Sequence, residues 1–205
     1  MLLGLLLPAL AVAGPAAKPK PAATGPVLVV GDSLSAAHNI PVAAGWVNLL
    51  DLRLKRDMKA PPAVVNASIS GETSAGALTR LPALLAKHRP SVVVIELGGN
   101  DALRGLAPAQ LRGNLARMIE LSQAAGAKVL LVGIDVPPNY GPAYRTRLKA
   151  TYAELAETYH TALLPFLLEG VALQPGMFQA DGLHPVAAAQ PKLLDNVWPV
   201  LKPLL

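Results

Sequence analysis

The chain has 205 residues, of which 52% are hydrophobic and 15% charged, which provides for one domain with a buried core and excludes a disordered chain. It contains no cysteine, so disulfides, zinc–thiolate sites and thiol nucleophiles are excluded. The formal net charge is +5, but the basic residues are dispersed among acidic ones, and we expect no nucleic-acid partner.

The first residues have the pattern of an export signal. Residues 1–13, MLLGLLLPALAVA, form an apolar run that ends in the small-x-small pattern of a signal-peptidase site, although no basic residue precedes the run. The run is shorter than the roughly 20 residues that a spanning helix needs, so no stable membrane anchor is expected. We predict cleavage after Ala13 and a periplasmic or secreted protein. Residues 14–25, rich in Pro and Ala, read as an extended linker, and the folded domain is predicted at 26–205.

Short apolar runs alternate with helical patterns through this domain. Strands are predicted at 27–30, 63–66, 91–97, 128–133 and 162–164. Helices are predicted at 46–58, 74–88, 108–126, 144–159 and 185–201. Pro82 weakens the case for a continuous second helix. Strands that alternate with helices predict an α/β fold with a parallel sheet covered by helices on both faces.

Four segments at predicted strand ends or before the last helix hold most of the reactive polar residues. They read Gly-Asp-Ser-Leu-Ser from 31, Ser-Ile-Ser-Gly-Glu-Thr from 68, Gly-Gly-Asn-Asp from 98, and Asp-Gly-Leu-His-Pro from 181. In open parallel sheets, chemistry collects just beyond the carboxyl ends of the strands. We therefore expect these four loops to lie together at one edge of the sheet.

These residue types match the needs of acyl transfer, which requires a nucleophile, a base, a group that orients the base, and donors for the oxyanion. Ser33 is the candidate nucleophile, at a predicted strand-to-helix turn where a helix N-terminus would favour negative charge. His184 can take its proton, and Asp181 can hold the other ring nitrogen. The Ser33 and Gly71 backbone N–H groups and the Asn100 amide can bind the oxyanion.

The four segments resemble the four sequence blocks of the SGNH or GDSL hydrolases, with Ser33, Gly71, Asn100 and His184 at the four named positions. The stretches VVNASISGETS, ELGGNDALRG and DGLHP are most similar to the bacterial periplasmic group described as thioesterase I, protease I, lysophospholipase and arylesterase. The resemblance extends from about Val27 to the C-terminus. Glu72 follows Gly71 where Asp is common in the family, a change that we expect to leave the chemistry intact.

The resemblance implies a three-layer α/β/α, flavodoxin-like fold with about five parallel strands, Asp181 in the triad, and no cofactor. It implies a small-molecule acyl ester or thioester substrate, with lysophospholipid as one candidate. The family's acyl-binding surface maps to the loops after Gly71, after Asn100 and around 137–140. Leu34, Leu106 and Tyr140 are the candidate substrate-binding residues, Asp32 is a supporting residue, and nothing demands more than a monomer.

Structural interpretations of the same residues stay open at this point. Ser33 and Asp32 could cap or brace a turn, and Asn100 suits a Gly-Gly-Asn-Asp turn. Asp181 and His184 lack an evident third ligand, so no metal site is expected. The remaining histidines, His38, His88 and His160, are interpreted as surface or helix-end residues, with the alternative that His38 lines the cleft.

Three functions remain in competition. The first is an ester and thioester hydrolase that forms an acyl-enzyme on Ser33. The second is a carbohydrate O-acetylesterase with the same chemistry, which an extended polar groove would favour. The third is a non-enzymatic flavodoxin-like binding module, although the Ser33 loop lacks the repeated donors of a phosphate cradle. No Gly-x-Ser-x-Gly elbow occurs in the chain, so an ordinary α/β-hydrolase would have no nucleophile.

Overall fold

The computed structural model describes residues 25–172 and 174–205. The predicted signal at 1–13 and the linker at 14–25 therefore lie outside the described residues, apart from Gly25. None of the helices in the described part of the chain is long and apolar enough to cross a membrane.

The centre of the fold is a five-stranded sheet in which every neighbouring pair is parallel, in the order β2-β1-β3-β4-β5. The strands are β1 (Val27–Gly31), β2 (Val64–Asn66), β3 (Val92–Glu96), β4 (Lys128–Val132) and β5 (Ala162–Leu164). All residues of β1 and β3 are buried, as expected for central strands that are covered on both faces. The predicted three-layer α/β/α fold is confirmed.

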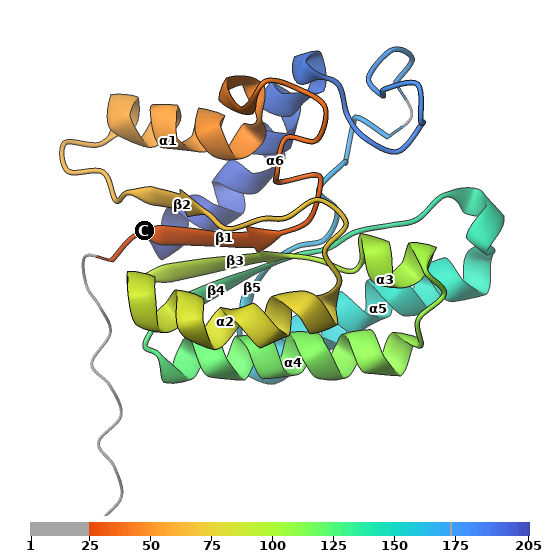
Figure 1. Cartoon of the computed structure of the whole chain (residues 1–205), viewed down its shortest axis with the longest axis horizontal. Helices are drawn as coiled ribbons and strands as arrows, with labels where there is room; N and C mark the ends of the chain where they lie inside the picture. Colours follow the sequence, from red (N-terminus) through yellow and green to blue (C-terminus); the bar gives the residue numbers. More distant parts are fainter. Residues whose placement is uncertain (1–24, 173) are drawn as a thin grey trace, which may run out of the picture.

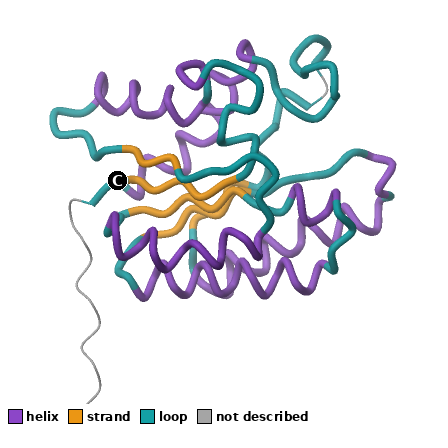
Figure 2. Tube along the Cα trace, in the orientation of Figure 1, coloured by secondary structure: helices purple, strands orange, loops and turns teal. Residues whose placement is uncertain are grey.

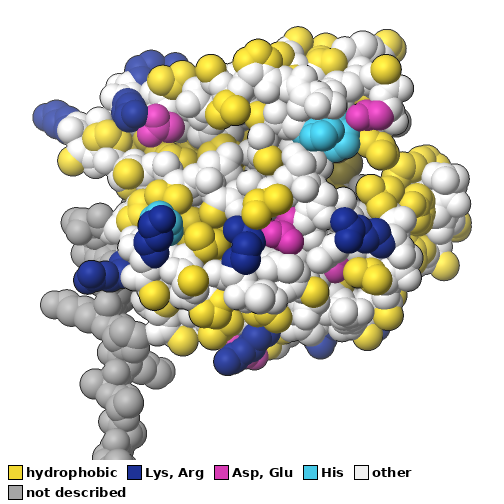
Figure 3. Space-filling model, viewed as in Figure 1, with side chains coloured by type: hydrophobic (Ala, Val, Ile, Leu, Met, Phe, Trp, Pro, Cys, Tyr) yellow, Lys and Arg dark blue, Asp and Glu magenta, His cyan; other side chains and the backbone are white. Residues whose placement is uncertain are grey.

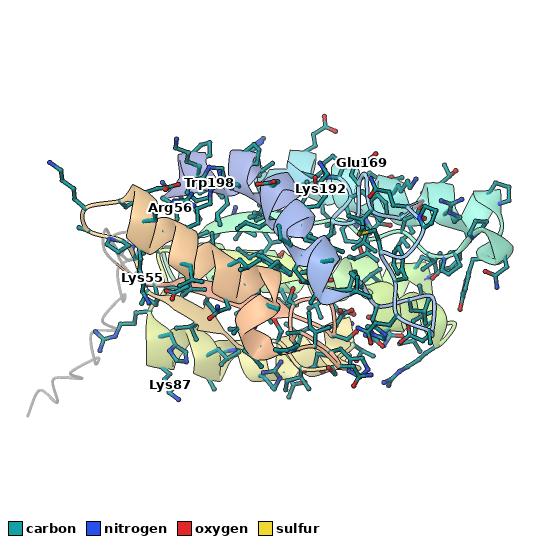
Figure 4. The ribbon with its side chains drawn as sticks, turned by 90° about the horizontal axis from the view of Figure 1, so that it is seen from above. Lys55, Arg56, Lys87, Glu169, Lys192 and Trp198 are labelled. Carbon is teal, nitrogen blue, oxygen red and sulfur yellow. The ribbon has the colours of Figure 1, made fainter. Side chains whose placement is uncertain are left out.

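Helices cover both faces of the sheet (Figure 1). The α-helices are α1 (Trp46–Asp57), α2 (Ser74–His88), α3 (Gly99–Leu103), α4 (Pro108–Ala124), α5 (Pro142–Tyr159) and α6 (Gln190–Leu201). The short 3-10 helices are Val42–Ala44, Pro138–Tyr140, Ala187–Ala189 and Lys202–Leu204. On one face α1 packs beside α6, and Figure 4 looks down on this pair, with Arg56 on α1 and Trp198 on α6 labelled. On the other face α4 lies between α2 and α5.

The parallel topology directs all the strands toward one edge of the sheet, and the longer loops gather there (Figure 2). The register pairs Gly31, at the end of β1, with Glu96, at the end of β3. The segments that follow these two strands therefore begin at the same level. This places the Ser33 loop beside the Asn100 segment.

Two local predictions need correction. The last α-helix begins at Gln190 rather than Pro185, because Pro185 pairs with Phe178 in an antiparallel bridge and residues 187–189 form a separate 3-10 helix. No regular helix begins at Ser33; hydrogen-bonded turns occupy residues 33–39, so the expected helix dipole is absent at that position. The Gly-Gly-Asn-Asp segment, which also suits a turn, forms the start of α3. By contrast, α2 runs without a break through Pro82, as predicted.

Candidate active site

The structure brings Ser33, His184 and Asp181 into one hydrogen-bonded chain. The Ser33 Oγ lies 2.9 Å from His184 Nε2, and His184 Nδ1 lies 2.7 Å from Asp181 Oδ2. Ser33 follows β1, whereas Asp181 and His184 come from the loop that precedes α6. His184 is 151 residues after Ser33 in the sequence. Both ring nitrogens thus have the partners that a nucleophile–base–carboxylate arrangement requires.

The Asp181 carboxylate is fixed by its own loop. Its Oδ1 accepts the backbone N–H of Leu183 at 2.9 Å and that of His184 at 3.0 Å, which leaves Oδ2 for the imidazole. These backbone donors, followed by the imidazole, hold the pKa of Asp181 well below its ordinary value. Asp181 is therefore an anion at any pH at which His184 can act as a base.

Two of the three candidate oxyanion donors, Gly71 and Asn100, lie on neighbouring segments that follow β2 and β3. Gly71 follows β2 with a φ of 79°, a left-handed conformation that glycine adopts without strain. Asn100 is in the first turn of α3, and its Nδ2 donates to Asp32 Oδ2 at 3.1 Å. Asp32 also accepts the Leu34 backbone N–H at 3.0 Å, so it braces both the Ser33 turn and the Asn100 amide.

Several side chains that brace the Gly71 loop were not identified from the sequence. Arg104 donates to the Gly71 carbonyl at 2.9 Å. Arg80, on α2, donates to Glu72 Oε2 at 2.9 Å and to the Ala67 carbonyl at 3.1 Å, so it holds the loop at both ends. Their partners lie 8 to 33 residues away in the sequence, so no local motif predicts these contacts.

A buried network joins the same loop to α3. Asp101 accepts the Ser74 backbone N–H at 2.9 Å and the Ser74 hydroxyl at 2.5 Å, and Asn114 donates to that hydroxyl at 2.9 Å. Ser74 is the first residue of α2, directly after the Gly71 loop, and Asp101 follows Asn100. The network therefore fixes the distance between the two candidate oxyanion segments.

His38 lies beside His184, although it is not among the residues that line the cavity described below. Its Nδ1 lies 3.2 Å from the Ser70 Oγ, and its ring lies against that of His184. Gln179 donates to the His38 carbonyl at 2.9 Å and to the Pro185 carbonyl at 3.2 Å, so it joins the two histidine-bearing segments. His38 is half-buried at the surface, and its contacts with Ser70 and His184 could not be found from the sequence because these partners are far away along the chain.

A cavity of about 110 Å³ opens beside Ser33 and His184. Most of its wall is apolar, formed by Leu34, Leu103, Ile134, Val136, Pro137, Leu168 and Leu183. Of the candidate substrate-binding residues, Leu34 lines this cavity, whereas Leu106 and Tyr140 do not; Tyr140 packs on Tyr144 instead, with ring centroids 6.0 Å apart. In the space-filling view, histidine and acidic side chains lie near apolar ones on this part of the surface (Figure 3).

The geometry suits nucleophilic attack on a carbonyl carbon. A hydroxyl beside an imidazole that is held by a carboxylate can be deprotonated as it attacks. The Ser33 and Gly71 N–H groups and the Asn100 amide are the candidate donors for the developing oxyanion. No group of three or more His, Cys, Asp and Glu side chains that could hold a metal ion occurs among residues 25–172 and 174–205.

Comparisons with known proteins show clear similarities in sequence and fold. A profile of the GDSL-like lipase/acylhydrolase family matches residues 29–190. The chain is 60% identical over 184 residues to esterase TesA of Pseudomonas aeruginosa, covering 90% of this chain and 91% of the relative. It is 44% identical over 184 residues to thioesterase 1/protease 1/lysophospholipase L1 of Escherichia coli, covering 90% and 86%. A crystal structure of TesA superposes with a TM-score of 0.85 at 60% identity, covering 87% of this chain and 99% of the other.

Proposed function

Because the chain belongs to the GDSL-like lipase/acylhydrolase family and is a serine hydrolase of esters and thioesters, we propose that Ser33 is its nucleophile, His184 its general base and acid, and Asp181 the residue that orients His184. The observation that supports this assignment is the continuous chain from the Ser33 hydroxyl to the Asp181 carboxylate, with contacts of 2.9 and 2.7 Å.

In this mechanism the Ser33 Oγ bonds to the acyl carbon while His184 Nε2 takes the hydroxyl proton. The carbonyl oxygen becomes an oxyanion that accepts the N–H groups of Ser33 and Gly71 and the Asn100 amide; each such donor is worth about 2.7–4 kcal/mol of barrier. The bond to the leaving oxygen or sulfur then breaks, and His184 returns the proton to it. Water, activated by the same imidazole, releases the acid and restores Ser33.

The apolar cavity supports acyl chains rather than sugar groups as the occupants. Leu34 and the other apolar residues of its wall offer dispersion contacts and no hydrogen-bond donors for a glycan hydroxyl. The names of the relatives add aryl esters, thioesters and lysophospholipids to the candidate substrates. We further propose that the enzyme acts as a monomer in the periplasm or outside the cell, after cleavage of residues 1–13.

The test is hydrolysis of p-nitrophenyl esters from acetyl to palmitoyl by the full chain and by Ser33→Ala. We expect activity near background in this variant, with an unchanged circular dichroism spectrum. Ser91→Ala is the matched control, because Ser91 lies at the opposite end of the strands, where its hydroxyl donates to Gly25. Substantial turnover by S33A would refute the nucleophile, and exclusive use of the acetyl ester would favour the O-acetylesterase.

A second measurement tests the covalent step directly. The Ser33 Oγ should attack the phosphorus of an alkyl fluorophosphonate and displace fluoride, while His184 takes the hydroxyl proton. The chain should then carry one phosphonyl group, visible by intact mass spectrometry. The wild type and S91A should both gain this mass, whereas S33A should gain none. Labelling of S33A at the wild-type rate would contradict the assignment.

A further inference from the structure

Glu96 is a fully buried carboxylic acid at the end of the central strand β3. Its exposed fraction is 0%, and it pairs in register with Gly31 on β1. A charged side chain is almost never fully buried unless it is paired, because leaving water costs a carboxylate several kcal/mol. No Lys or Arg side chain among the described residues makes an ion pair or a hydrogen bond with Glu96.

The contacts of Glu96 all go to the loop that carries Ser33. Its Oε2 accepts the Ser35 hydroxyl at 2.7 Å and the Asp32 backbone N–H at 3.3 Å, one on each side of Ser33. The approach leaves no room for a side chain at position 31, where an added Cβ would lie 2.8 Å from the same oxygen. Glu96 thus fixes the turn of the nucleophile from below.

A second buried carboxyl lies beside Glu96. Asp32 is 2% exposed, and its backbone N–H lies 3.3 Å from Glu96 Oε2, so the two buried acids are neighbours, one directly after β1 and one at the end of β3. Neighbouring buried carboxylates repel each other strongly, so we expect the pair to retain one proton in the neutral pH range. The question is then which of the two residues carries it.

The distribution of donors answers this question. Both oxygens of Asp32 have a donor, from the Leu34 N–H and from the Asn100 amide. The Oε1 of Glu96 is buried and has no donor. Asp32 also borders the cavity together with His184, and the positive charge that His184 gains when it takes a proton favours the Asp32 anion. The proton of the pair therefore belongs on Glu96, whose Oε1 lacks a donor, rather than on Asp32, whose two oxygens both have one.

The electrostatics of the surrounding groups agree with this placement. Burial, and then the charge of Asp32, raise the pKa of Glu96 well above its ordinary value. Burial raises the pKa of Asp32 to about 6, against the opposing effect of the Leu34 and Asn100 donors. The other titratable groups that face the pair are Asp101, His184 and Tyr152; burial keeps the pKa of Tyr152 far above 10.0, so its phenol stays neutral.

We propose that Glu96 is a positioning residue of the hydrolase: it retains the proton of the Glu96–Asp32 pair, which keeps Asp32 anionic and thereby orients the Asn100 amide toward the oxyanion. An Asn100 Nδ2 that gives one hydrogen to Asp32 has its second hydrogen free for the substrate. A protonated Asp32 would compete as a donor and release the amide. This inference rests on the proposed oxyanion role of Asn100.

The consequence for catalysis is specific. An amide that turns away costs stabilisation of the transition state and leaves ground-state binding unchanged, so the loss falls on kcat rather than on KM. Glu96→Met should keep the fold, because an apolar side chain of similar length replaces a buried acid. We expect its kcat to fall by at least about tenfold with KM within about twofold. Glu96→Gln keeps one donor and one acceptor, as a protonated carboxyl does, and should restore kcat to within about threefold of the wild type.

A spectroscopic readout separates this proposal from the assignment of the nucleophile. At pH 7 the infrared spectrum of the wild type, and equally of the inactive S33A, should contain the carbonyl band of a buried protonated carboxylic acid that E96Q lacks. Absence of that difference overturns the proton placement. If the band is present but S33A stays active, the proposed nucleophile is refuted, whereas the placement of the proton on Glu96 is still supported.

A double-mutant cycle tests the route through Asp32. Asp32→Asn removes the anion, so E96M should cost less than about threefold in the D32N background if Glu96 acts through Asp32. Full additivity of the two losses would show that Glu96 only supports the fold. A fall of more than about tenfold in E96Q would mean that Glu96 is ionised in the wild type, and would also overturn the proposal.

Discussion

The imidazole ring of His38 lies against that of His184, with ring centroids 4.3 Å apart and the planes tilted by 42°. His38 also contacts Ser70, on the loop that carries the proposed oxyanion donor Gly71, at 3.2 Å. Its ring therefore bridges the proposed base and the oxyanion loop. A ring in that position limits the rotation of His184 and borders the charge that His184 acquires during attack on the substrate.

A fixed positive charge at position 38 should oppose the His184 imidazolium. We expect His38→Lys to lower kcat about tenfold, the scale of a charge–charge repulsion of roughly 1.4 kcal/mol at a partly solvated site. His38→Phe keeps the ring contact and should stay within about threefold of the wild type. Steady-state kinetics on a soluble p-nitrophenyl ester measure both. His88→Lys is the matched control at the far end of α2, and an equal loss in that variant would contradict the argument.

Asp32 should make the protein less stable as the pH rises. Its pKa is raised from 3.8 to about 6 in the folded protein, so the folded state binds more protons than the unfolded chain between these two values. The free energy of unfolding therefore falls as pH rises through this window, by an amount on the order of 2–3 kcal/mol. Burial of the Asp32 carboxylate thus lowers the stability of the folded protein, as is common for residues that active sites require.

Urea unfolding of the wild type and D32N at pH 4 and pH 7 measures this effect. We expect D32N to gain stability relative to the wild type as the pH rises, although its kcat is lower. A difference between the two proteins that is the same at both pH values would contradict the raised pKa of Asp32.

The sequence predicted the sheet and the meeting of four loops because these features follow from local patterns and one topological rule. Short apolar runs mark β1 and β3, and the carboxyl ends of parallel strands must share an edge. Ser33, Asn100, Asp181 and His184 are brought together for that reason, although their roles rest on the proposed mechanism. The start of α6 was misplaced because the bridge between Phe178 and Pro185 depends on tertiary contacts.

The bracing residues could not be predicted because their partners are distant in sequence. Glu96 reads as the polar end of an apolar strand until the register places it beside Gly31, and its Ser35 partner is 61 residues away. Arg104 reads as a surface cation until the fold brings it to the Gly71 carbonyl. His38 belongs to the same class, since its contact with Ser70 spans 32 residues. Only the folded chain reveals such pairs.

The position of the Glu72 side chain depends on Gly76, a glycine in the first turn of α2. A Cβ at position 76 would lie 2.1 Å from Glu72 Oε1, so Gly76→Ala should displace the Glu72 side chain from Arg80 and loosen the Gly71 loop. We expect kcat to fall about fivefold, which corresponds to the loss of about 1 kcal/mol from a partly buried ion pair. Combining G76A with the shorter side chain of Glu72→Asp should recover most of the loss.

Gly113 is the matched control for that substitution. It lies inside α4, and an added Cβ would have nothing within 4 Å. Gly113→Ala should therefore show the helix-propensity gain alone, roughly 0.5–1 kcal/mol in the free energy of unfolding, with unchanged kcat. Thermal melts and kinetics of the three variants provide the comparison. Equal kcat in G76A and the wild type would show that the Arg80–Glu72 pair does not position the loop.

Leu103 should contribute to binding of long acyl chains but not of short ones. It lines the apolar cavity beside Ser33, and 42% of its surface is exposed, so truncation costs little core packing. We expect Leu103→Ser to lower kcat/KM for an octanoyl ester about tenfold, since each buried methylene contributes about 0.8 kcal/mol. The acetyl ester is too short to reach this wall and should change by less than about twofold.

Leu52→Ser is the control for this prediction, because Leu52 is similarly exposed, at 54%, but lies on α1 and does not line the cavity. Comparing kcat/KM for acetyl, butyryl and octanoyl esters across the two variants separates a contact with the acyl chain from a general effect on solubility or stability. Equal losses on the acetyl and octanoyl esters in L103S would mean that Leu103 positions α3, and with it Asn100, rather than binding the chain. A loss confined to the longer esters would place the acyl group along the wall formed by α3.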